Sequence, residues 1–243
     1  MPLSGKTALI TGGGTGIGKA VAKHFRQAGC NVIISGRREE KLRETAEQIG
    51  LSSEMKYRAT DMSDRAQVND LISWCHKEFG DIDILVANAG VNVVERRLEN
   101  ITAENWDYIM NVNATGAFNI MHAVLEPMRQ RKDGLIISIS SIAGIRPSEL
   151  GGAAYSAAKA GMDALTKVIG LEERHHGIRT CVISPGEVDT PILEQRPVPV
   201  SDDHRSRILQ PDDVARAAVF VASLPSRASV PTLVIKPTSQ EFV

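Results

Sequence analysis

Short apolar runs alternate with longer amphipathic stretches from one end of the chain to the other. Runs rich in β-branched residues predict strands, whereas apolar residues that recur at helical spacing predict helices. The expected strands cover residues 7–11, 31–35, 55–60, 82–87, 135–140, 179–183 and 232–236. The expected helices cover residues 17–28, 39–49, 64–79, 103–131, 153–176 and 211–223. This alternation predicts an α/β fold with a doubly wound, Rossmann-like parallel sheet and right-handed crossovers.

The pattern offers no place at which to divide the chain. We find no linker, repeat or low-complexity tract in it, and 243 residues suit one α/β domain. Residues 1–243 are therefore expected to form a single domain. Residues 191–210 interrupt the alternation with charged residues and prolines, and we expect this segment to be a mobile substrate-binding loop or lid.

Composition and charge argue against several kinds of partner. The formal net charge is -1, which gives no electrostatic reason to expect nucleic acid or an anionic membrane. No signal-peptide pattern opens the chain, and no apolar run is long enough to span a bilayer. The dispersed cysteines, Cys30, Cys75 and Cys181, predict reduced core thiols in a cytoplasmic protein. The adjacent His175 and His176 have no ligand at helical spacing beside them, so we expect no metal site.

A glycine-rich segment joins the first expected strand to the first expected helix. It reads Thr-Gly-Gly-Gly-Thr-Gly-Ile-Gly over residues 11–18. Glycines in such a segment let the backbone turn tightly and approach a pyrophosphate, while the helix offers free N–H groups and the positive end of its dipole. The segment therefore predicts a dinucleotide site, with contacts from Gly12, Gly14, Thr15, Gly16, Ile17 and Gly18.

The end of the second expected strand indicates which dinucleotide binds. In dinucleotide folds, an acidic residue about 20 positions further on usually holds the 2′-hydroxyl of the adenosine ribose. This chain instead reads Ser35-Gly36-Arg37-Arg38, with no acid before Glu39. A hydroxyl and guanidinium groups would bind and neutralise a 2′-phosphate. We therefore predict NADP(H) as cofactor, with contacts from Ser35, Arg37 and Arg38, against the alternative of a basic helix start without a ligand.

Further motifs follow in an order that resembles the short-chain dehydrogenase/reductase family over nearly the whole chain. The glycine segment matches the family's TGxxxGxG, residues 88–90 match its NAG element, and residues 155–159 match its YxxxK. The resemblance implies that the catalytic residues are Asn113, Ser141, Tyr155 and Lys159. It also implies cofactor contacts from Asp61, Met62, Asn88, Ala89, Gly90, Tyr155, Lys159, Pro185, Gly186, Val188 and Thr190. Members commonly assemble as tetramers, so the resemblance implies a homo-oligomer, either a tetramer or a dimer.

The chemistry of Tyr155 and Lys159 supports the same roles. Four positions apart on a helix, the two side chains share a face. A phenol has a pKa of about 10, and a neighbouring ammonium favours the phenolate. In reduction we expect Tyr155 to donate a proton to the carbonyl oxygen as the cofactor delivers hydride, while Ser141 hydrogen-bonds that oxygen. By resemblance, Lys159 also binds the nicotinamide ribose, and Asn113 supports a water-linked proton route through Lys159.

The chain departs from the family pattern near its C-terminal end. Residues 230–240 lack the DGG-like turn of many members and resemble a subgroup of bacterial enzymes that act on short 3-hydroxy acids and related hydroxy compounds. Arg146, a few residues after Ser141, would be placed to meet a substrate carboxylate, but an exposed loop arginine without a ligand is the preferred interpretation.

A regulatory protein that senses NADP(H) without turnover is the alternative function. Such proteins typically lose the tyrosine or the lysine of the YxxxK motif, whereas this chain has both. A sugar-nucleotide epimerase of the extended group would carry a further substrate domain, for which we expect the chain to be too short. The sequence therefore favours an oxidoreductase whose partner is a small carbonyl or alcohol substrate.

Overall fold

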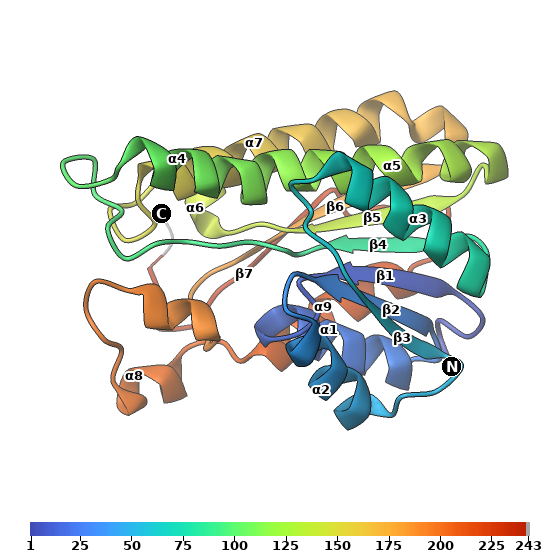
Figure 1. Ribbon diagram of the computed structural model, residues 1–243, viewed down its shortest axis with the longest axis horizontal. Coiled ribbons are helices and arrows are strands. Elements are labelled where there is room, and N and C mark those ends of the chain that lie inside the picture. Colours follow the sequence, from blue (N-terminus) through green and yellow to red (C-terminus); the bar gives the residue numbers. More distant parts are fainter. Residues whose placement is uncertain (242–243) are drawn as a thin grey trace.

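A computed structural model describes residues 1–241, and its centre is one sheet of seven parallel strands (Figure 1). The strand order is β3-β2-β1-β4-β5-β6-β7. The strands are β1 (Thr7–Thr11), β2 (Asn31–Gly36), β3 (Met55–Ala59), β4 (Ile84–Ala87), β5 (Gly134–Ile139), β6 (Ile178–Pro185) and β7 (Thr232–Ile235). All neighbouring strands pair in parallel, which confirms the expected doubly wound sheet.

Helices cover both faces of this sheet (Figure 1). One face carries α1 (Gly16–Gln27), α2 (Glu39–Ile49) and α9 (Pro211–Ser223). The other face carries α3 (Arg65–Phe79), α4 (Ala103–Met110), α5 (Gly116–Arg131) and α7 (Ala153–Glu172). The short helices α6 (Ile142–Ile145) and α8 (Asp202–Arg207) lie beyond the carboxyl ends of the strands. Among the described residues, no helix is both long and apolar enough to cross a membrane.

Two apolar cores result, one on each face of the sheet. Along β1, Ala8 and Ile10 pack into the core beneath α1 and α9, whereas Leu9 packs into the core beneath α3 and α5. The strand is buried throughout, which explains why its sequence is a continuous apolar run rather than an alternating one.

The strand order reverses direction between β1 and β4. Successive strands run outward on one side of this point as β1, β2 and β3, and on the other side as β4 to β7. In open α/β sheets, ligands bind in the crevice outside the carboxyl ends of the strands at such a reversal. The fold therefore places a binding site beside the glycine-rich segment that follows β1.

The long helix expected over residues 103–131 is not continuous. Residues Asn111–Thr115 form a π-helix between α4 and α5, in which the Gly116 N–H donates to the Asn111 carbonyl five residues back. Such wide turns are rare and occur mostly at functional sites. The helix expected over residues 153–176 is also shorter, because α7 ends at Glu172 and a separate 3-10 helix, Arg174–His176, follows it.

The segment expected to be a mobile substrate-binding loop or lid contains two short helices. Residues Pro191–Gln195 form a 3-10 helix and Asp202–Arg207 form α8. The three cysteines, by contrast, lie in the core as expected, and burial raises the pKa of each thiol to about 12.

Candidate active site

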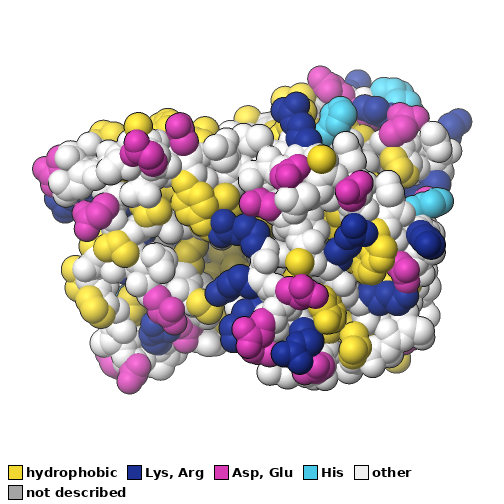
Figure 2. Space-filling view, in the orientation of Figure 1, with side chains coloured by type: hydrophobic (Ala, Val, Ile, Leu, Met, Phe, Trp, Pro, Cys, Tyr) yellow, Lys and Arg dark blue, Asp and Glu magenta, His cyan; other side chains and the backbone are white. Residues whose placement is uncertain are grey.

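A cavity of about 680 Å³ opens at the carboxyl ends of the strands. Figure 2 shows the molecule hollowed near the middle of this face, with Lys and Arg side chains along the edge of the hollow. Most residues expected at the site line this cavity: Gly12, Gly14, Thr15, Gly16, Ile17, Arg37, Arg38, Asp61, Met62, Asn88, Ala89, Gly90, Ser141, Tyr155, Lys159, Pro185, Gly186, Val188 and Thr190. Three expected residues, Gly18, Ser35 and Asn113, lie outside its lining.

The glycine turn after β1 leaves no room for side chains. Gly12 has a φ of 67°, and a Cβ atom there would lie 2.8 Å from the Asn88 Nδ2 atom. A Cβ atom on Gly18 would lie 2.3 Å from the Gly12 carbonyl oxygen, so Gly18 permits α1 to approach the turn instead of contacting a ligand. The first turn of α1 has no acidic residue and no side-chain cap at Thr15. Its N–H groups and dipole are thus available to a phosphate.

Asn88 connects this turn to the end of β4. Its Nδ2 atom donates to the Thr11 carbonyl at 2.9 Å and to the Gly12 carbonyl at 3.3 Å. In return, the Thr11 hydroxyl accepts from the Asn88 and Ala89 N–H groups, each at 3.0 Å. These bonds therefore hold together the ends of β1 and β4, the two strands on either side of the reversal.

Three cations line the cavity near the start of α2. Arg37 donates to the Tyr108 hydroxyl at 2.8 Å and lies 5.5 Å from the centre of that ring. Arg38 lies next to it, and Lys41 also lines the cavity, although we did not anticipate it from the sequence. A tight glycine turn, an open helix N-terminus and this cluster of cations fit the phosphates of a dinucleotide.

Ser35 does not join these cations. It is fully buried in β2, and its hydroxyl donates to the Arg58 carbonyl at 2.8 Å. The expected hydrogen bond from Ser35 to a 2′-phosphate is therefore not supported, because this hydroxyl is buried and donates to the neighbouring strand β3.

Tyr155 and Lys159 lie in the wall of the same cavity, one turn apart on α7. The Lys159 Nζ atom lies 5.8 Å from the centre of the Tyr155 ring and donates to the Ile139 carbonyl at 2.9 Å. This bond ties the lysine to the end of β5. The expectation that the two side chains share a face directed at the site agrees with their positions.

Burial dominates the protonation of both groups. Burial raises the pKa of Tyr155 above its ordinary value, although the Ser141 hydroxyl and the Arg96 charge oppose this in part. Burial also lowers the pKa of Lys159 to about 8, with Asp163 opposing. In the protein alone, the lysine therefore does not bring the phenol towards its ionised form as the sequence suggested. A protonated phenol is nevertheless the state that a proton donor needs.

Ser141 and Asn113 complete the set of expected catalytic residues. Ser141 precedes α6, and its hydroxyl accepts from the Ala143 N–H at 3.1 Å. Asn113, in the π-helix, is fully buried and lies behind the cavity wall. Its side chain accepts from the Val91 N–H at 2.7 Å and donates to the Val91 carbonyl at 2.9 Å. Asn113 thus fixes the loop after β4 instead of lining the cavity.

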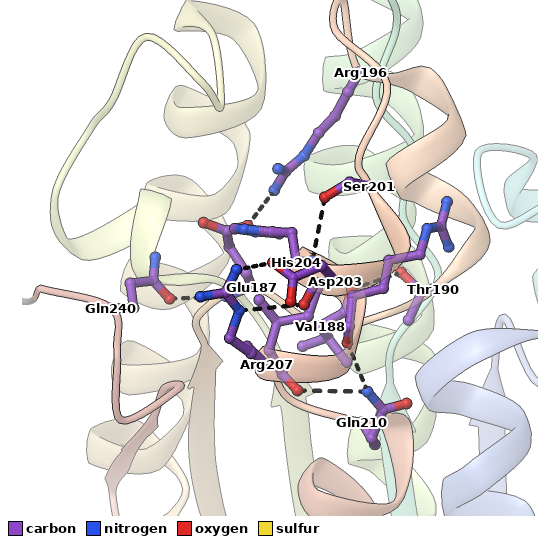
Figure 3. A network of polar contacts seen from close by, with 12 residues as sticks. Glu187, Val188, Thr190, Arg196, Ser201, Asp203, His204, Arg207, Gln210 and Gln240 are labelled. Carbon is purple, nitrogen blue, oxygen red and sulfur yellow. Dashed lines mark hydrogen bonds and ion pairs between the residues drawn. The ribbon is translucent and has the colours of Figure 1, made fainter.

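A polar network closes the other side of the cavity (Figure 3). Glu187, two residues after β6, accepts from the Arg196 side chain at 2.9 Å and contacts His204 Nε2 at 2.7 Å. The Gln240 side chain accepts from the Glu187 N–H at 3.0 Å, which brings the C-terminal segment to the site. Burial raises the pKa of Glu187, but the bonds with His204 and Arg196 outweigh it and leave this pKa below its usual value.

Several lining residues were missed in the sequence, among them Lys41, Arg96, Tyr108, Glu187 and Gln240. Lys41 carries a local signal, because it follows Arg38 at helical spacing. The others lie on loops, on α4 or in the C-terminal segment, and no local pattern marks them. Arg146, which the sequence did single out, is exposed and does not line the cavity.

Comparison with known proteins gives consistent matches along most of the chain. The model for the family described as short chain dehydrogenase matches residues 6–198. The D-beta-hydroxybutyrate dehydrogenase of Cupriavidus necator is 34% identical over 243 aligned residues, which cover 93% of each chain. Among solved structures, the closed form of serine dehydrogenase complexed with NADP+ has a TM-score of 0.87 and 30% identity, covering 97% of this chain and 96% of that one. The 3-ketoacyl-(acyl-carrier-protein) reductase from Brucella melitensis complexed with NADH has a TM-score of 0.88 and 29% identity, covering 96% of this chain and 98% of that one.

Proposed function

Because the chain belongs to the short-chain dehydrogenase family, we propose that it is an NADP(H)-dependent oxidoreductase that interconverts a carbonyl group and an alcohol, with Tyr155 as general acid and base. The observation that carries this proposal is the position of Tyr155, Lys159 and Ser141 in one cavity with the glycine turn. When bound, the nicotinamide supplies or accepts the hydride.

The protein residues handle the proton and the developing charge. In reduction, the Tyr155 hydroxyl donates its proton to the carbonyl oxygen, and its raised pKa keeps that proton available near neutrality. The Ser141 hydroxyl hydrogen-bonds the same oxygen as negative charge develops. In oxidation, the Tyr155 phenolate accepts the proton of the alcohol, and the Lys159 ammonium stabilises the phenolate.

Lys159 and Asn113 support this step. Lys159 is proposed to bind the nicotinamide ribose and to take part in proton transfer to solvent. The Asn113 side chain is occupied by the Val91 backbone, so we propose that it supports this route by holding the loop after β4 in place. A Cβ atom on Gly90 of this loop would lie 3.4 Å from the Asn113 Oδ1 atom and 3.5 Å from the Lys159 Nζ atom, so the three residues are close together.

Three cations support NADP(H) over NAD(H). Arg37, Arg38 and Lys41 line the cavity together with the glycine turn, and their positive charge would neutralise a 2′-phosphate on the adenosine ribose. The solved relatives do not decide the question, because one was crystallised with NADP+ and another with NADH. The preference therefore depends on this cluster of side chains.

We also propose that residues 191–210 act as a lid and that the protein is a homo-oligomer, either a tetramer or a dimer. Residues 191–196 form part of the cavity wall, and Glu187 holds the segment through its bonds with Arg196 and His204. Exposed apolar side chains on α5 and α7, namely Phe118, Val168 and Leu171, support association between copies. Sedimentation of the purified chain measures its oligomeric state.

The experiment that tests the reaction compares the wild type with Tyr155→Phe. Both should bind NADPH, measured by its fluorescence, but the variant should lose carbonyl reduction by a factor on the order of 10³. Tyr57→Phe, on β3, is the matched control and should keep the wild-type rate. A Tyr155→Phe variant with near-normal turnover would contradict the role of this phenol. A wild-type chain that binds NADPH but reduces no aldehyde, ketone or oxo acid would favour the regulatory alternative.

A further inference from the structure

Arg96 is a buried cation in the wall of the active-site cavity. Its side chain comes from the loop between β4 and α4, and the residue is only 6% exposed. It lines the cavity together with Tyr155 and Ser141. Across residues 1–241, no ion pair includes Arg96.

Within the described residues, the hydrogen bonds of Arg96 go to backbone carbonyls alone. Its guanidinium donates to the carbonyls of Val93 at 2.8 Å, Leu150 at 3.1 Å and Gln195. A guanidinium has five N–H donors, so these bonds leave donors for a further acceptor. Neutral carbonyls offset only part of the free energy that it costs to bury a charge. Burial and the neighbouring Arg196 accordingly lower the pKa of Arg96 below its usual value.

Each of the other cations that line the cavity either has an acidic partner or is proposed to bind the cofactor. Arg196 is paired with Glu187, as Figure 3 shows. Lys159 donates to the Ile139 carbonyl and is proposed to bind the ribose. Arg37, Arg38 and Lys41 form the cluster beside the glycine turn, where a Cβ atom on Gly14 would lie 3.2 Å from Lys41, and they are proposed to bind the cofactor. Of the cations that line the cavity in the described part of the chain, Arg96 is thus the one that remains for the substrate.

We propose that Arg96 binds a carboxylate of the substrate, and that the enzyme therefore acts on short oxo acids and hydroxy acids. This inference rests on the proposed carbonyl reduction. The planar fork of a guanidinium matches a carboxylate in a bidentate arrangement. The apolar residues Val93, Leu150 and Ile192, which also line the cavity, suit a short aliphatic substrate around that charged end.

A purely structural role for Arg96 is the alternative, because its three bonds join the loop after β4, the segment before α7 and the lid. A matched pair of substrates separates the two roles: acetoacetate and methyl acetoacetate differ mainly in charge. With NADPH, the ratio of kcat/KM for the acid to kcat/KM for the ester should fall about 30-fold or more in Arg96→Gln. Arg97→Gln, an exposed neighbour outside this cavity, should leave the ratio unchanged. An equal loss for both compounds would assign Arg96 to structure alone and overturn the proposal.

Arg96→Lys keeps the positive charge but lacks the planar guanidinium. It is the more conservative variant, and it tests the proposal if Arg96→Gln does not fold. It should retain part of the preference for the acid. Binding can also be measured without turnover, because a ligand that binds the folded state raises the Tm. In wild type saturated with NADP+, which has no hydride to donate to an oxo acid, acetoacetate should raise the Tm more than methyl acetoacetate, and this difference should disappear in Arg96→Gln.

These measurements distinguish failure of the inference from failure of the reaction. If the wild type reduces methyl acetoacetate at least as efficiently as acetoacetate, the inference is wrong and the carbonyl reduction stands. If the wild type reduces neither compound, but Arg96 is required for the larger Tm shift with the acid, the reaction is wrong and the anion site stands.

Discussion

Asp163 lies one turn beyond Lys159 on α7, and both residues are almost completely buried, at 4% and 3% exposure. Burial lowers the pKa of Lys159, and the Asp163 carboxylate opposes that effect. Burial also raises the pKa of Asp163, with the Ser140 hydroxyl opposing. One face of α7 thus carries three titratable residues at four-residue spacing, namely Tyr155, Lys159 and Asp163. We infer that Asp163 helps to keep the lysine charged near neutral pH.

Replacing this carboxylate should move the pH dependence of catalysis. In Asp163→Asn, the pKa of Lys159 should fall further below about 8, because the negative charge that opposes the burial of the ammonium is then absent. The alkaline limb of kcat/KM for carbonyl reduction should shift to lower pH, while the rate in mildly acidic buffer changes little. Glu172→Gln, at the exposed end of α7, is the control and should leave the profile in place. Superimposable profiles for Asp163→Asn and wild type would show that Asp163 does not tune the lysine.

Reversing one charge near the glycine turn should change the cofactor preference. In Arg37→Asp, the ratio of kcat/KM for NADPH to that for NADH should fall by about 100-fold, because a carboxylate repels a 2′-phosphate and accepts from a ribose hydroxyl. Steady-state kinetics with both cofactors measure this ratio. Arg43→Asp, exposed on α2 and outside the cavity, makes the same change of charge and should have little effect. An unchanged ratio in Arg37→Asp would remove Arg37 from the cofactor site.

Glu187 should control how firmly the lid is held. In Glu187→Gln, the ion pair with Arg196 and the carboxylate contact with His204 are lost, so amide hydrogen exchange over residues 191–207 should become faster and the substrate KM should rise. In the wild type the pKa of Glu187 is lowered, so these pairs contribute above the unfolded pKa and are lost as the pH falls through the lower folded value. Asp203→Asn removes a surface pair within α8 and is the control. Unchanged exchange in Glu187→Gln would contradict this role for Glu187.

A second ion-pair cluster, far from the cavity, should affect stability alone. Glu173 accepts from Arg129 Nε at 2.8 Å and contacts His176 at 2.9 Å, and its pKa is lowered to about 2, chiefly by the bond with Arg129. Glu173→Gln should lower the free energy of unfolding at neutral pH by about 1 kcal/mol. Because the folded pKa is depressed, the difference from wild type should persist above the unfolded pKa and vanish as the pH falls through about 2.

Urea unfolding over a pH series measures this difference. Glu126→Gln is the matched control, because Glu126 contacts the same Arg129 at 3.5 Å but is mostly exposed. It should change stability less than Glu173→Gln. A loss in Glu173→Gln that does not depend on pH would point to packing instead of charge.

The arrangement of strands and helices could be predicted from the sequence because each element carries its own periodic signal. The bounds of α2 and α9 agree with the expected ranges. Tyr155 and Lys159 could also be placed together, since four residues on a helix fix their relative direction. The glycine turn was visible for a similar reason, because its position between a strand and a helix is local.

Features that depend on non-local contacts were not predictable in the same way. The spacing of apolar residues does not reveal a single turn that contains one additional residue, so the sequence does not predict the π-helix Asn111–Thr115. The position of Ser35 in the sequence predicts a contact with the phosphate, but its hydroxyl donates to the Arg58 carbonyl of the paired strand β3. Arg96 contacts a segment 99 residues away, and Glu187 contacts residues 9, 17 and 53 positions away, so no helical or strand period marks either residue.

The wide turn at Asn111–Thr115 makes the number of residues there as consequential as their identity. A π-helix rotates less per residue than an α-helix, so about five residues there turn through nearly the same angle as about four residues of a regular helix. Removing one of them would let α4 and α5 merge into a regular helix without turning Ile109 away from Ala154 and Ala158 of α7. The deletion would remove the wide turn itself, and with it the alignment of Asn113 with the Val91 backbone. We therefore expect a deletion at this point to disturb the loop after β4 more than the packing of α4 on α7.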